Sequence, residues 1–377
     1  MPLRVLMAPD KFKGTLTAAA AAAALAEGWR RVRPDDEVRC RPISDGGDGF
    51  GEVLSAALGA AAREVETVDA AHRPLRAAWW WEPRQRLAII ESARIIGLAL
   101  LPRGRFHPRE LDTWGLGAAL EAAAAQGARR CVLGIGGSAT NDGGFGLARA
   151  LGWTFWDAQE RPIPSWTGLA RLRRVEPPAR RLPLRVTVAV DVQNRLLGAR
   201  GCTRIYGPQK GLTAADFAPA EAALRRLAQV MQRERGRALH LLPGSGAAGG
   251  LGFGLMAFLG ARLAPGFELL ARHTRLAGAV RWAEVVVTGE GALDASSLMG
   301  KGVGELARLC ARHRRPCLGV AGVVALPERH WRRWLEAAVA LSSLTPPEEA
   351  QARAAFWVAE AAAALAAQFS AGRARKV

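Results

Sequence analysis

Cysteine is scarce in this chain, and its spacing argues against two kinds of site. The 377 residues include five cysteines, and no two of them form a C-x-x-C motif. A small disulfide framework needs an even set of cysteines, and a structural zinc site needs cysteine or histidine ligands at short spacing. We therefore expect neither kind of site, and the pattern favours a reducing, cytoplasmic environment.

Long hydrophobic runs are also few. The apolar run near the N-terminus lies between Arg4 and Asp10, which is too short for the core of a signal peptide. The uncharged stretch 241–261 is long enough to span a membrane, but it contains seven glycines and Pro243. We expect this stretch to be a glycine-rich loop that continues into a buried helix, and we expect no membrane partner.

Acidic residues are in the minority among the charged side chains. The chain has 52 Lys and Arg against 34 Asp and Glu, a formal net charge of +18. A nucleic-acid-binding protein would gather basic residues on one face or alternate them with aromatic residues. Here most are Arg, spread over helical segments such as 224–237. We expect solvated faces that attract an anionic substrate and no nucleic-acid partner; a basic nucleic-acid-binding protein stays a remote alternative.

Several catalytic motifs are absent as well. The sequence has no H-E-x-x-H motif, no G-x-S-x-G elbow, no Walker A loop and no H-R-D or D-F-G kinase motif. These absences exclude zinc proteases, serine hydrolases of the common type, P-loop enzymes and protein kinases. Any kinase activity must therefore belong to a less common architecture.

The order of the segments present indicates an α/β protein. Apolar, β-branched runs alternate with Ala-, Leu- and Arg-rich segments of helical period, as in βαβ units with a parallel sheet. Runs 64–68 and 75–81 instead alternate like an antiparallel pair with one exposed face. The expected strands are 4–8, 38–42, 131–135, 186–190, 285–288, 317–321 and 337–341, and the expected helices 17–32, 116–126, 219–234, 302–313 and 347–368.

We predict a Rossmann-like parallel-sheet domain interleaved with a second, smaller α/β domain. The expected boundaries are 1–62, 108–152 and 268–377 for the first domain, and 63–107 and 153–267 for the second. Glycine-rich stretches 143–146 and 244–254 are the candidate hinges for closure of one domain on the other.

Five of the expected strands run into segments rich in acid and glycine. Because the carboxyl ends of parallel strands share one edge, and ligands bind outside that edge, we expect these segments to converge. Glycine amides can approach phosphate oxygens, carboxylates can hold Mg²⁺ or accept a proton, and lysines offset charge on a transferred group. These are the components of phosphoryl transfer from a nucleotide. The segments are 9–15, 44–49, 136–144, 191–194 and 288–294.

One competing interpretation is an NAD(P)-dependent dehydrogenase of a small hydroxy acid. Residues 134–139 fit the loose G-x-G-x-x-A fingerprint after a strand, and Asp157 lies near the position of a ribose-binding acid. Against it, residues 140–144 intervene before the helix. A second match, 244–249, is interpreted as a phosphate or sugar contact loop.

Four motifs together resemble the bacterial glycerate kinase family that forms 2-phosphoglycerate. They are APDKFKG at 8–14, GIGGSATNDGG at 134–144, YGPQKG at 206–211, and TGEGALD at 288–294 with Gly300-Lys301. The resemblance runs from about residue 3 to 325. It implies a kinase that phosphorylates D-glycerate at the 2-position with ATP and Mg²⁺, with the active site in a cleft between two α/β domains. The implied partners are glycerate and ATP, for a monomer or a homodimer.

The candidate residues have distinct expected roles. Asp191 or Asp45 is expected to accept the proton of the acceptor hydroxyl, while Lys210 and Lys301 act as charge clamps. The candidate catalytic residues are Asp191, Asp45, Lys11, Lys13 and Lys301. The candidates for substrate and nucleotide binding are Asp10, Gly46, Gly47, Asp48, Gly136, Gly137, Ser138, Thr140, Asn141, Asn194, Gln209, Lys210, Gly246, Gly249, Gly289 and Glu290. The candidate Mg²⁺ ligands are Asp142 and Asp294.

Overall fold

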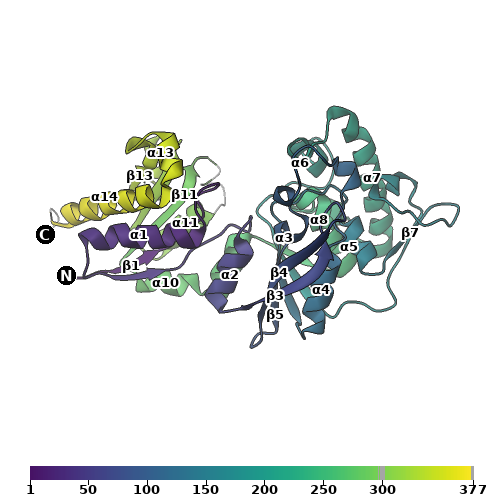
Figure 1. Cartoon of the computed structure of the whole chain (residues 1–377), viewed down its shortest axis with the longest axis horizontal. Helices are drawn as coiled ribbons and strands as arrows, with labels where there is room; N and C mark the ends of the chain where they lie inside the picture. The colour runs from purple at the N-terminus through teal and green to yellow at the C-terminus, as the bar shows by residue number, and fades with distance from the viewer. Residues whose placement is uncertain (296, 298–301, 375–377) are drawn as a thin grey trace. The chain divides into compact units, whose positions relative to one another are not determined.

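The computed structural model of the chain consists of two compact units, each with its own sheet (Figure 1). Unit 1 is formed by Met1–Asp45 and Phe267–Val377, and unit 2 by Gly46–Gly266. The chain therefore passes from one unit to the other at 45–46 and again at 266–267. The structure describes residues 1–295, 297 and 302–374.

Unit 1 contains a five-stranded parallel sheet in the order β13-β12-β11-β1-β2. Apolar residues of β1, β11 and β12 form one core with α1 and α14, which lie side by side (Figure 1). The strands are β1 (Arg4–Met7), β2 (Glu37–Cys40), β11 (Val285–Leu293), β12 (Cys317–Val324) and β13 (Ala337–Ala340). The helices are α1 (Ala18–Val32), α9 (Gly266–His273), α10 (Leu276–Trp282), α11 (Gly302–Arg312), α12 (Glu328–Trp331), α13 (Pro347–Ala352) and α14 (Ala354–Ala374).

Unit 2 contains a six-stranded mixed sheet in the order β10-β9-β6-β5-β4-β3. β10, β9, β6 and β5 are parallel, and β3 and β4 add the expected antiparallel pair. The strands are β3 (Ala61–Val68), β4 (Pro74–Glu82), β5 (Leu87–Glu91), β6 (Arg130–Gly134), β9 (Arg185–Ala189) and β10 (Arg262–Ala264), with a separate pair β7 (Thr154–Trp156) and β8 (Arg174–Glu176). The helices are α2 (Phe50–Leu58), α3 (Ala93–Ile96), α4 (Leu116–Ala125), α5 (Phe145–Ala150), α6 (Cys202–Lys210), α7 (Ala214–Arg235) and α8 (Ala247–Leu259).

The α/β class, the parallel core and the antiparallel pair are confirmed, but the chain is divided differently from the expected boundaries. Residues 46–62 and 108–152 lie in unit 2 because β6 pairs with β5 and β9. Unit 2, expected to be the smaller, holds the larger share of the chain. The candidate hinges also lie inside unit 2, where the amide of Gly143 donates to the carbonyl of Gly249.

Two apolar segments have clear places in these cores. The stretch 241–261 is a loop followed by the buried helix α8, as predicted. Within the described residues, one helix, α14, is long and apolar enough to cross a membrane, with a mean hydropathy of 1.3 over 354–371. Its residues Val358, Ala361 and Leu365 are buried in the unit 1 core against α1. The expected helix 347–368 is broken at Arg353, which separates α13 from α14.

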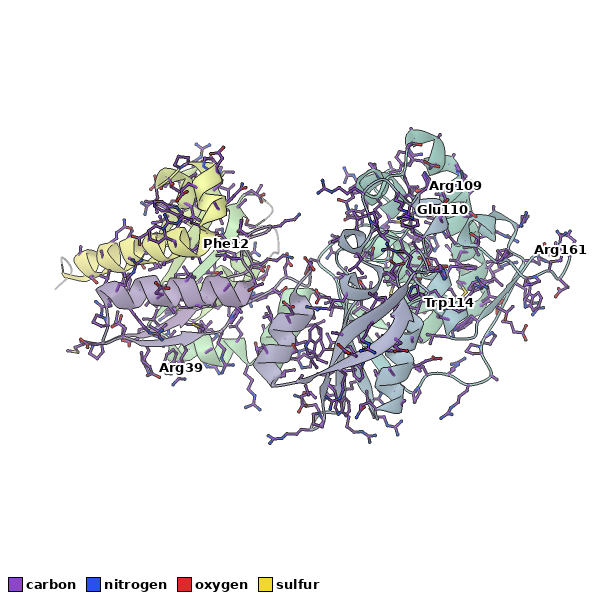
Figure 2. The ribbon with its side chains drawn as sticks, viewed as in Figure 1. Phe12, Arg39, Arg109, Glu110, Trp114 and Arg161 are labelled. Atoms are coloured by element: carbon purple, nitrogen blue, oxygen red, sulfur yellow. The ribbon has the colours of Figure 1, made fainter. Side chains whose placement is uncertain are left out.

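Arginine side chains are distributed over both units, and many of them stack on aromatic rings. Figure 2 labels Arg39 on unit 1 and Arg109 and Arg161 on unit 2. The guanidinium of Arg39 lies 3.9 Å from the centre of the Trp282 ring. Such stacking covers aromatic surface while leaving the charge at the solvent. It gives the Arg- and Trp-rich composition a structural use.

At Gly28, helix propensity and packing make opposite predictions. In an isolated helix, Gly→Ala gains about 1 kcal/mol, but a Cβ at Gly28 would lie 1.9 Å from the carbonyl oxygen of Ala359 on α14. We expect Gly28→Ala to lower the free energy of unfolding by about 2–3 kcal/mol, because α1 and α14 must move apart. Urea unfolding measures this change.

Gly278→Ala on α10 is the matched control. Only the far end of Arg281 lies within 4 Å of a Cβ there, so this substitution should raise the free energy of unfolding by about 0.5–1 kcal/mol. Equal stabilisation by both substitutions would contradict the close packing of α1 on α14.

Candidate functional site

The five acid- and glycine-rich segments lie at two sheet edges rather than one. Three of them follow β1, β2 and β11 of unit 1, and two follow β6 and β9 of unit 2. The segment after β2 passes into unit 2 at Gly46, so its residues 46–49 belong to unit 2. In each sheet these strands are parallel, so their carboxyl ends share an edge. The structure thus groups these segments at two separate sheet edges, one in each unit.

In unit 2, two glycine loops approach each other backbone to backbone. A Cβ at Gly136 would lie 2.9 Å from the Cα of Gly47, so the chain after β6 packs directly on the chain before α2. Gly46 has φ of +100°, and a Cβ there would lie 2.8 Å from Oδ2 of Asp191. Both the left-handed conformation and the close approach require glycine at 46. The two loops and Asp191 therefore form one compact group.

Asp191 follows β9 and is half-buried at this edge. Its Oδ1 accepts a hydrogen bond of 3.1 Å from the amide of Gly266, and its Oδ2 lies on the side of Gly46. One oxygen is thus held by the backbone. The carboxylate is oriented beside Gly46, whose loop packs on Gly136.

Lys210 supports the loop after β6 through hydrogen bonds. Its buried Nζ donates to the carbonyl of Thr140 at 2.7 Å and to Oγ of Ser138 at 3.2 Å. Burial lowers the pKa of Lys210 to about 8, an effect that Cys202 and Asp142 oppose. Lys210 is therefore an internal support of the 136–140 loop. Its neighbour on α6, Gln209, is exposed.

The same loop and its surroundings also pack against α8 and the stretch before it. A Cβ at Gly249 would lie 1.9 Å from the carbonyl oxygen of Thr140, and one at Gly246 would lie 2.3 Å from that of Arg195. Nδ2 of the buried Asn141 donates to Oγ1 of Thr203 at 3.0 Å. Residues 244–249, expected to contact a phosphate or sugar, thus make close contacts within unit 2.

Asn194 links the loop after β9 to its surroundings. The hydroxyl of Tyr206 donates to Oδ1 of Asn194 at 2.6 Å, and Nδ2 of Asn194 donates to the carbonyl of Arg200. The amide of Gly246 donates to the carbonyl of Asn194 at 2.9 Å. Asn194 therefore ties α6 and the 244–249 stretch to this edge.

Asp142 is fully buried and surrounded by donors from its own unit. Its Oδ2 accepts from the amide and hydroxyl of Thr113, at 3.0 and 2.7 Å, and from the amide of Gly146. Its Oδ1 accepts from the amide of Gly144 at 3.1 Å. Burial and the nearby Asp112 raise the pKa of Asp142 to about 6, which these hydrogen bonds oppose. The carboxylate joins the start of α5 to the segment before α4, a use that favours a structural role.

In unit 1, Asp10 lies among other carboxylates at the edge formed by β1, β2 and β11. Burial, followed by the charges of Asp45 and Glu290, raises the pKa of Asp10 to about 7, while the Lys11 amide and side chain oppose this. The start of α11 is adjacent, since a Cβ at Gly302 would lie 3.0 Å from Oδ2 of Asp10. Negative charge gathered in this way favours a cation or a proton at Asp10.

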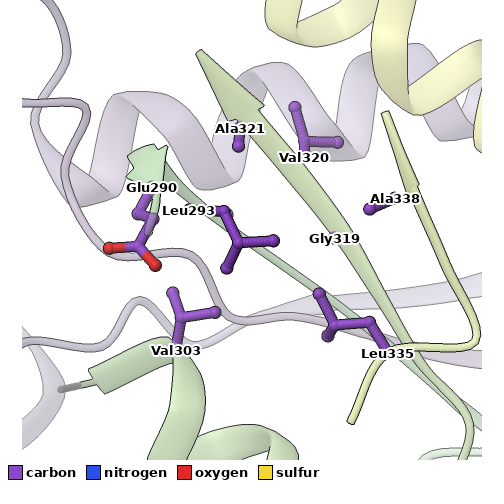
Figure 3. Close-up of a pocket in the computed structure, with 9 residues that line it drawn as sticks. Glu290, Leu293, Val303, Gly319, Val320, Ala321, Leu335 and Ala338 are labelled. Carbon is purple, nitrogen blue, oxygen red and sulfur yellow. The ribbon is translucent and has the colours of Figure 1, made fainter. Parts of the chain in front are cut away.

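A small cavity adjoins this edge of unit 1 (Figure 3). It has a volume of about 10 Å³, enough for roughly one water molecule. Among the described residues that line it, Glu290 is the one charged side chain, and the others include Leu293, Val303 and Leu335.

The remaining candidates have simpler positions. Lys13 is exposed, and Lys11 is half-buried beside Asp10. Oδ1 of Asp294 accepts from the amide of Ser297 in the turn after β11. Lys301 lies outside the described residues. Within the part of the chain that the structure describes, no three His, Cys, Asp or Glu side chains are close enough to form a metal site together.

The proposed dehydrogenase fingerprint is not organised for a dinucleotide. α5 begins only at Phe145 and has six residues, whereas the fingerprint requires the helix to start within the glycine motif. Oδ1 of Asp157 accepts from the amides of Gln159 and Arg161, so this acid closes a local turn next to β7. The ribose-binding role expected in that interpretation has no support here.

Two residues that the sequence analysis did not select also belong to the unit 2 group. Glu91 ends β5 and is 2% exposed, and Thr113 is fully buried against Asp142. Glu91 follows an apolar strand like the other acids, but no glycine stands beside it. A search for acids at strand ends alone, without the glycine condition, would have found it.

Comparison with known proteins gives consistent results. The model of the "Glycerate kinase family" matches residues 5–370. A glycerate kinase of Halalkalibacterium halodurans is 37% identical over 322 residues, covering 84% of this chain and 85% of that protein. A glycerate 2-kinase of Escherichia coli K12 is 34% identical over 330 residues, covering 85% of each chain. The crystal structure described as glycerate kinase 2 of Salmonella typhimurium LT2 has a TM-score of 0.85 at 32% identity, covering 99% of this chain and 100% of that one.

The buried amine of Lys210 predicts an unusual dependence of stability on pH. Its pKa is about 8 in the folded protein against an ordinary 10.5, so between these values the unfolded chain binds more protons than the folded one. The free energy of unfolding should therefore rise with pH in this window, by up to about 3 kcal/mol. Urea unfolding at pH 7.5, 8.5 and 9.5 measures the rise.

Two variants separate this effect from the titration of other groups. Lys210→Met should lack the rise, whereas Lys13→Met, which removes an exposed lysine, should keep it. Parallel pH profiles for the wild type and Lys210→Met would contradict the burial of a titrating amine at this position.

Proposed function

The chain belongs to the glycerate kinase family and is a kinase, and from that premise we propose that it transfers the γ-phosphoryl group of ATP to the 2-hydroxyl of D-glycerate. The products are ADP and 2-phosphoglycerate. The observation that supports this most is the unit 2 group, in which Asp191 lies against Gly46 and the 46–49 loop packs on Gly136. It combines a held carboxylate with backbone that a phosphate can approach.

We assign the role of general base to Asp191. The glycerate hydroxyl gives its proton to this carboxylate as its oxygen bonds to the γ-phosphorus, and the bond from that phosphorus to the bridging oxygen of ADP breaks. ADP leaves with the electron pair of the broken bond, and the proton stays on Asp191 until it passes to solvent. Asp45, in unit 1, is the alternative base. A positioned base is worth roughly 10²–10⁴ in rate.

The 136–140 loop is assigned to the bound anions. Gly137 in this loop is exposed, so phosphate or glycerate carboxylate oxygens can approach its backbone, and Ser138 and Thr140 add hydroxyl groups to the loop. Lys210 enters this assignment as the support of the loop, since its Nζ already donates to Ser138 and Thr140. The positive charge of Lys210 also offsets the negative charge of an anion bound at this loop.

The residues of unit 1 fit Mg²⁺ bound together with nucleotide phosphates. Mg²⁺ takes oxygen ligands, and in kinases it uses one or two carboxylates and completes its shell with water and phosphate. Burial is the largest cause of the raised pKa of Asp10, and the charges of Asp45 and Glu290 raise it further. This excess of negative charge suits a cation. When bound, the ion would neutralise charge on the phosphates. Asp142 does not fit this role, since its oxygens already accept four hydrogen bonds.

Replacement of Asp191 tests the proposed base. Asp191→Asn should lower kcat for D-glycerate by roughly 10²–10⁴ while KM for ATP changes little, because Asn keeps the shape and the hydrogen bond to Gly266. A coupled ADP-release assay with D-glycerate, L-glycerate, tartronate and glycerol measures both, and ³¹P NMR identifies the product. Asp157→Asn, which alters a local turn, is the control and should keep kcat.

Near wild-type kcat in Asp191→Asn, with a loss of 10² or more in Asp45→Asn, would move the base to Asp45. If the wild-type protein turns over none of the four acceptors, the proposed reaction itself is rejected.

The pH dependence of Mg²⁺ binding tests the role of Asp10. Because its pKa is about 7, a proton competes with the cation below that pH. The apparent Kd for Mg²⁺ should rise about tenfold for each pH unit below 7 and level off above it. Isothermal titration with MgCl₂ in the absence of nucleotide measures this, and Asp10→Asn should flatten the profile. A flat wild-type profile between pH 5 and 8 would contradict the assignment.

A further inference from the structure

Glu91 connects two elements of unit 2 that are distant in the sequence. It ends β5 and is 2% exposed, yet its carboxylate reaches the start of α2. The amide of Gly49 donates a hydrogen bond to its Oε1. A Cβ at Gly51, in the first turn of α2, would lie 3.2 Å from its Oε2. The side chain thus lies directly against the beginning of this helix.

The start of α2 depends on this contact because the helix lacks a side-chain cap of its own. Its N-cap residue is Gly49, in the left-handed conformation with φ of +88°, and no side chain there accepts a hydrogen bond. The first amides of any helix need partners and favour a negative charge. Glu91 supplies both from the neighbouring strand, across 42 residues of sequence.

Arg94 completes the connection from the α3 side. Its Nε lies 3.4 Å from Oε2 of Glu91, and its Nη2 donates to Oε1 of Glu52 on α2. Its guanidinium carbon is 5.0 Å from the centre of the Trp80 ring on β4. Burial raises the pKa of Glu91, whereas the Gly49 amide and Arg94 oppose this. The position of the carboxylate is therefore fixed by β5, to which Glu91 belongs, and by Arg94 of the short helix α3.

The segment that Glu91 holds is the loop of the proposed active site. Gly46 and Gly47 stand just before Gly49, and they contact Asp191 and Gly136 respectively. Movement at Gly49 would shift both contacts. A displacement of about 1 Å in such a group can cost roughly 10²-fold in rate.

We propose that Glu91 is a positioning residue for phosphoryl transfer, which fixes the 46–49 loop against Asp191 through the Gly49 amide. This inference rests on the proposed function for its catalytic consequence. Glu91 itself touches neither of the reacting groups in this assignment. Its carboxylate acts through the backbone that it holds.

Three variants at this position separate the hydrogen bond from the charge. Glu91→Gln keeps an oxygen acceptor for the Gly49 amide, Glu91→Asp withdraws it by one methylene, and Glu91→Ala removes it. We expect kcat to fall about 100-fold in Glu91→Ala, about 10- to 30-fold in Glu91→Asp and less than fivefold in Glu91→Gln. KM for ATP and D-glycerate should stay within about threefold in all three.

Glu82 provides a matched control in the same sheet. It is also a buried glutamate, 6% exposed, whose oxygens accept from the amides of Arg84 and Gln85. Because β4 runs antiparallel to β5, Glu82 pairs with Leu87 at the opposite edge of the sheet. Glu82→Ala should therefore lose stability without a selective loss of kcat.

The experiment combines kinetics with hydrogen–deuterium exchange of the full-length protein. Exchange over residues 46–54 should be at least tenfold faster in Glu91→Ala than in the wild type, and unchanged in Glu91→Gln and Glu82→Ala. Wild-type kcat in Glu91→Ala, or an equal fall in Glu82→Ala, would overturn the positioning role. If Glu91→Ala does not fold, equal kcat in Glu91→Asp and Glu91→Gln would overturn it.

The two proposals fail in different ways. Absence of glycerate-dependent ADP formation by the wild type would overturn the proposed function. Unchanged exchange over 46–54 in both Glu91→Ala and Glu91→Asp would overturn the role of Glu91, whatever reaction the wild type catalyses.

Discussion

Unit 2 depends on the direct contact of backbone with backbone where three glycine-containing segments meet. Gly136 packs on the chain at Gly47, and Gly249 packs on the carbonyl of Thr140 at a distance that leaves no room for a Cβ. The loop after β6 is thereby enclosed between two other loops. Side chains at these positions would separate the layers by more than an ångström and carry Asp191 away from its neighbours. The contacts place a carboxylate, hydroxyls and amides together.

The charges of the two units are arranged differently. In unit 2, Asp142 has its hydrogen bonds satisfied within the fold, and Lys210 is directed at the loop that it supports. In unit 1, burial and the neighbouring acids Asp45 and Glu290 raise the pKa of Asp10 to about 7. A charged side chain whose hydrogen bonds are satisfied within the fold stabilises the fold. A group of side chains with an excess of negative charge instead favours binding of a cation. This contrast is the reason for proposing a cation site in unit 1 and the framework of an anion site in unit 2.

Local patterns in the sequence predicted most of the elements but not their partners. Strands such as β1, β6 and β9 were found because apolar, β-branched runs end in glycine or acid, and α1 because Thr17 caps an alanine-rich segment. The sheet that β6 joins depends on pairing with strands distant in the chain, which no local pattern records. The break between α13 and α14 at Arg353 has no proline or glycine to mark it.

The candidate site was predictable where chemistry and backbone requirement coincide, as at Gly46 and Gly136. The inward direction of Lys210 and the four hydrogen bonds of Asp142 follow from tertiary packing, so the sequence alone suggested a charge clamp and a metal ligand for them. Glu91 was missed because no glycine stands beside it, and its contact with the start of α2, 42 residues earlier, follows from tertiary packing. The central claim is that contact between the glycine loops positions the groups for phosphoryl transfer. The most direct measurement is the rate of D-glycerate-dependent ADP formation by Gly136→Ala, where the added Cβ would lie 2.9 Å from Gly47. The account predicts a folded protein whose kcat is at least about 100-fold below wild type; a folded variant with wild-type kcat would contradict it.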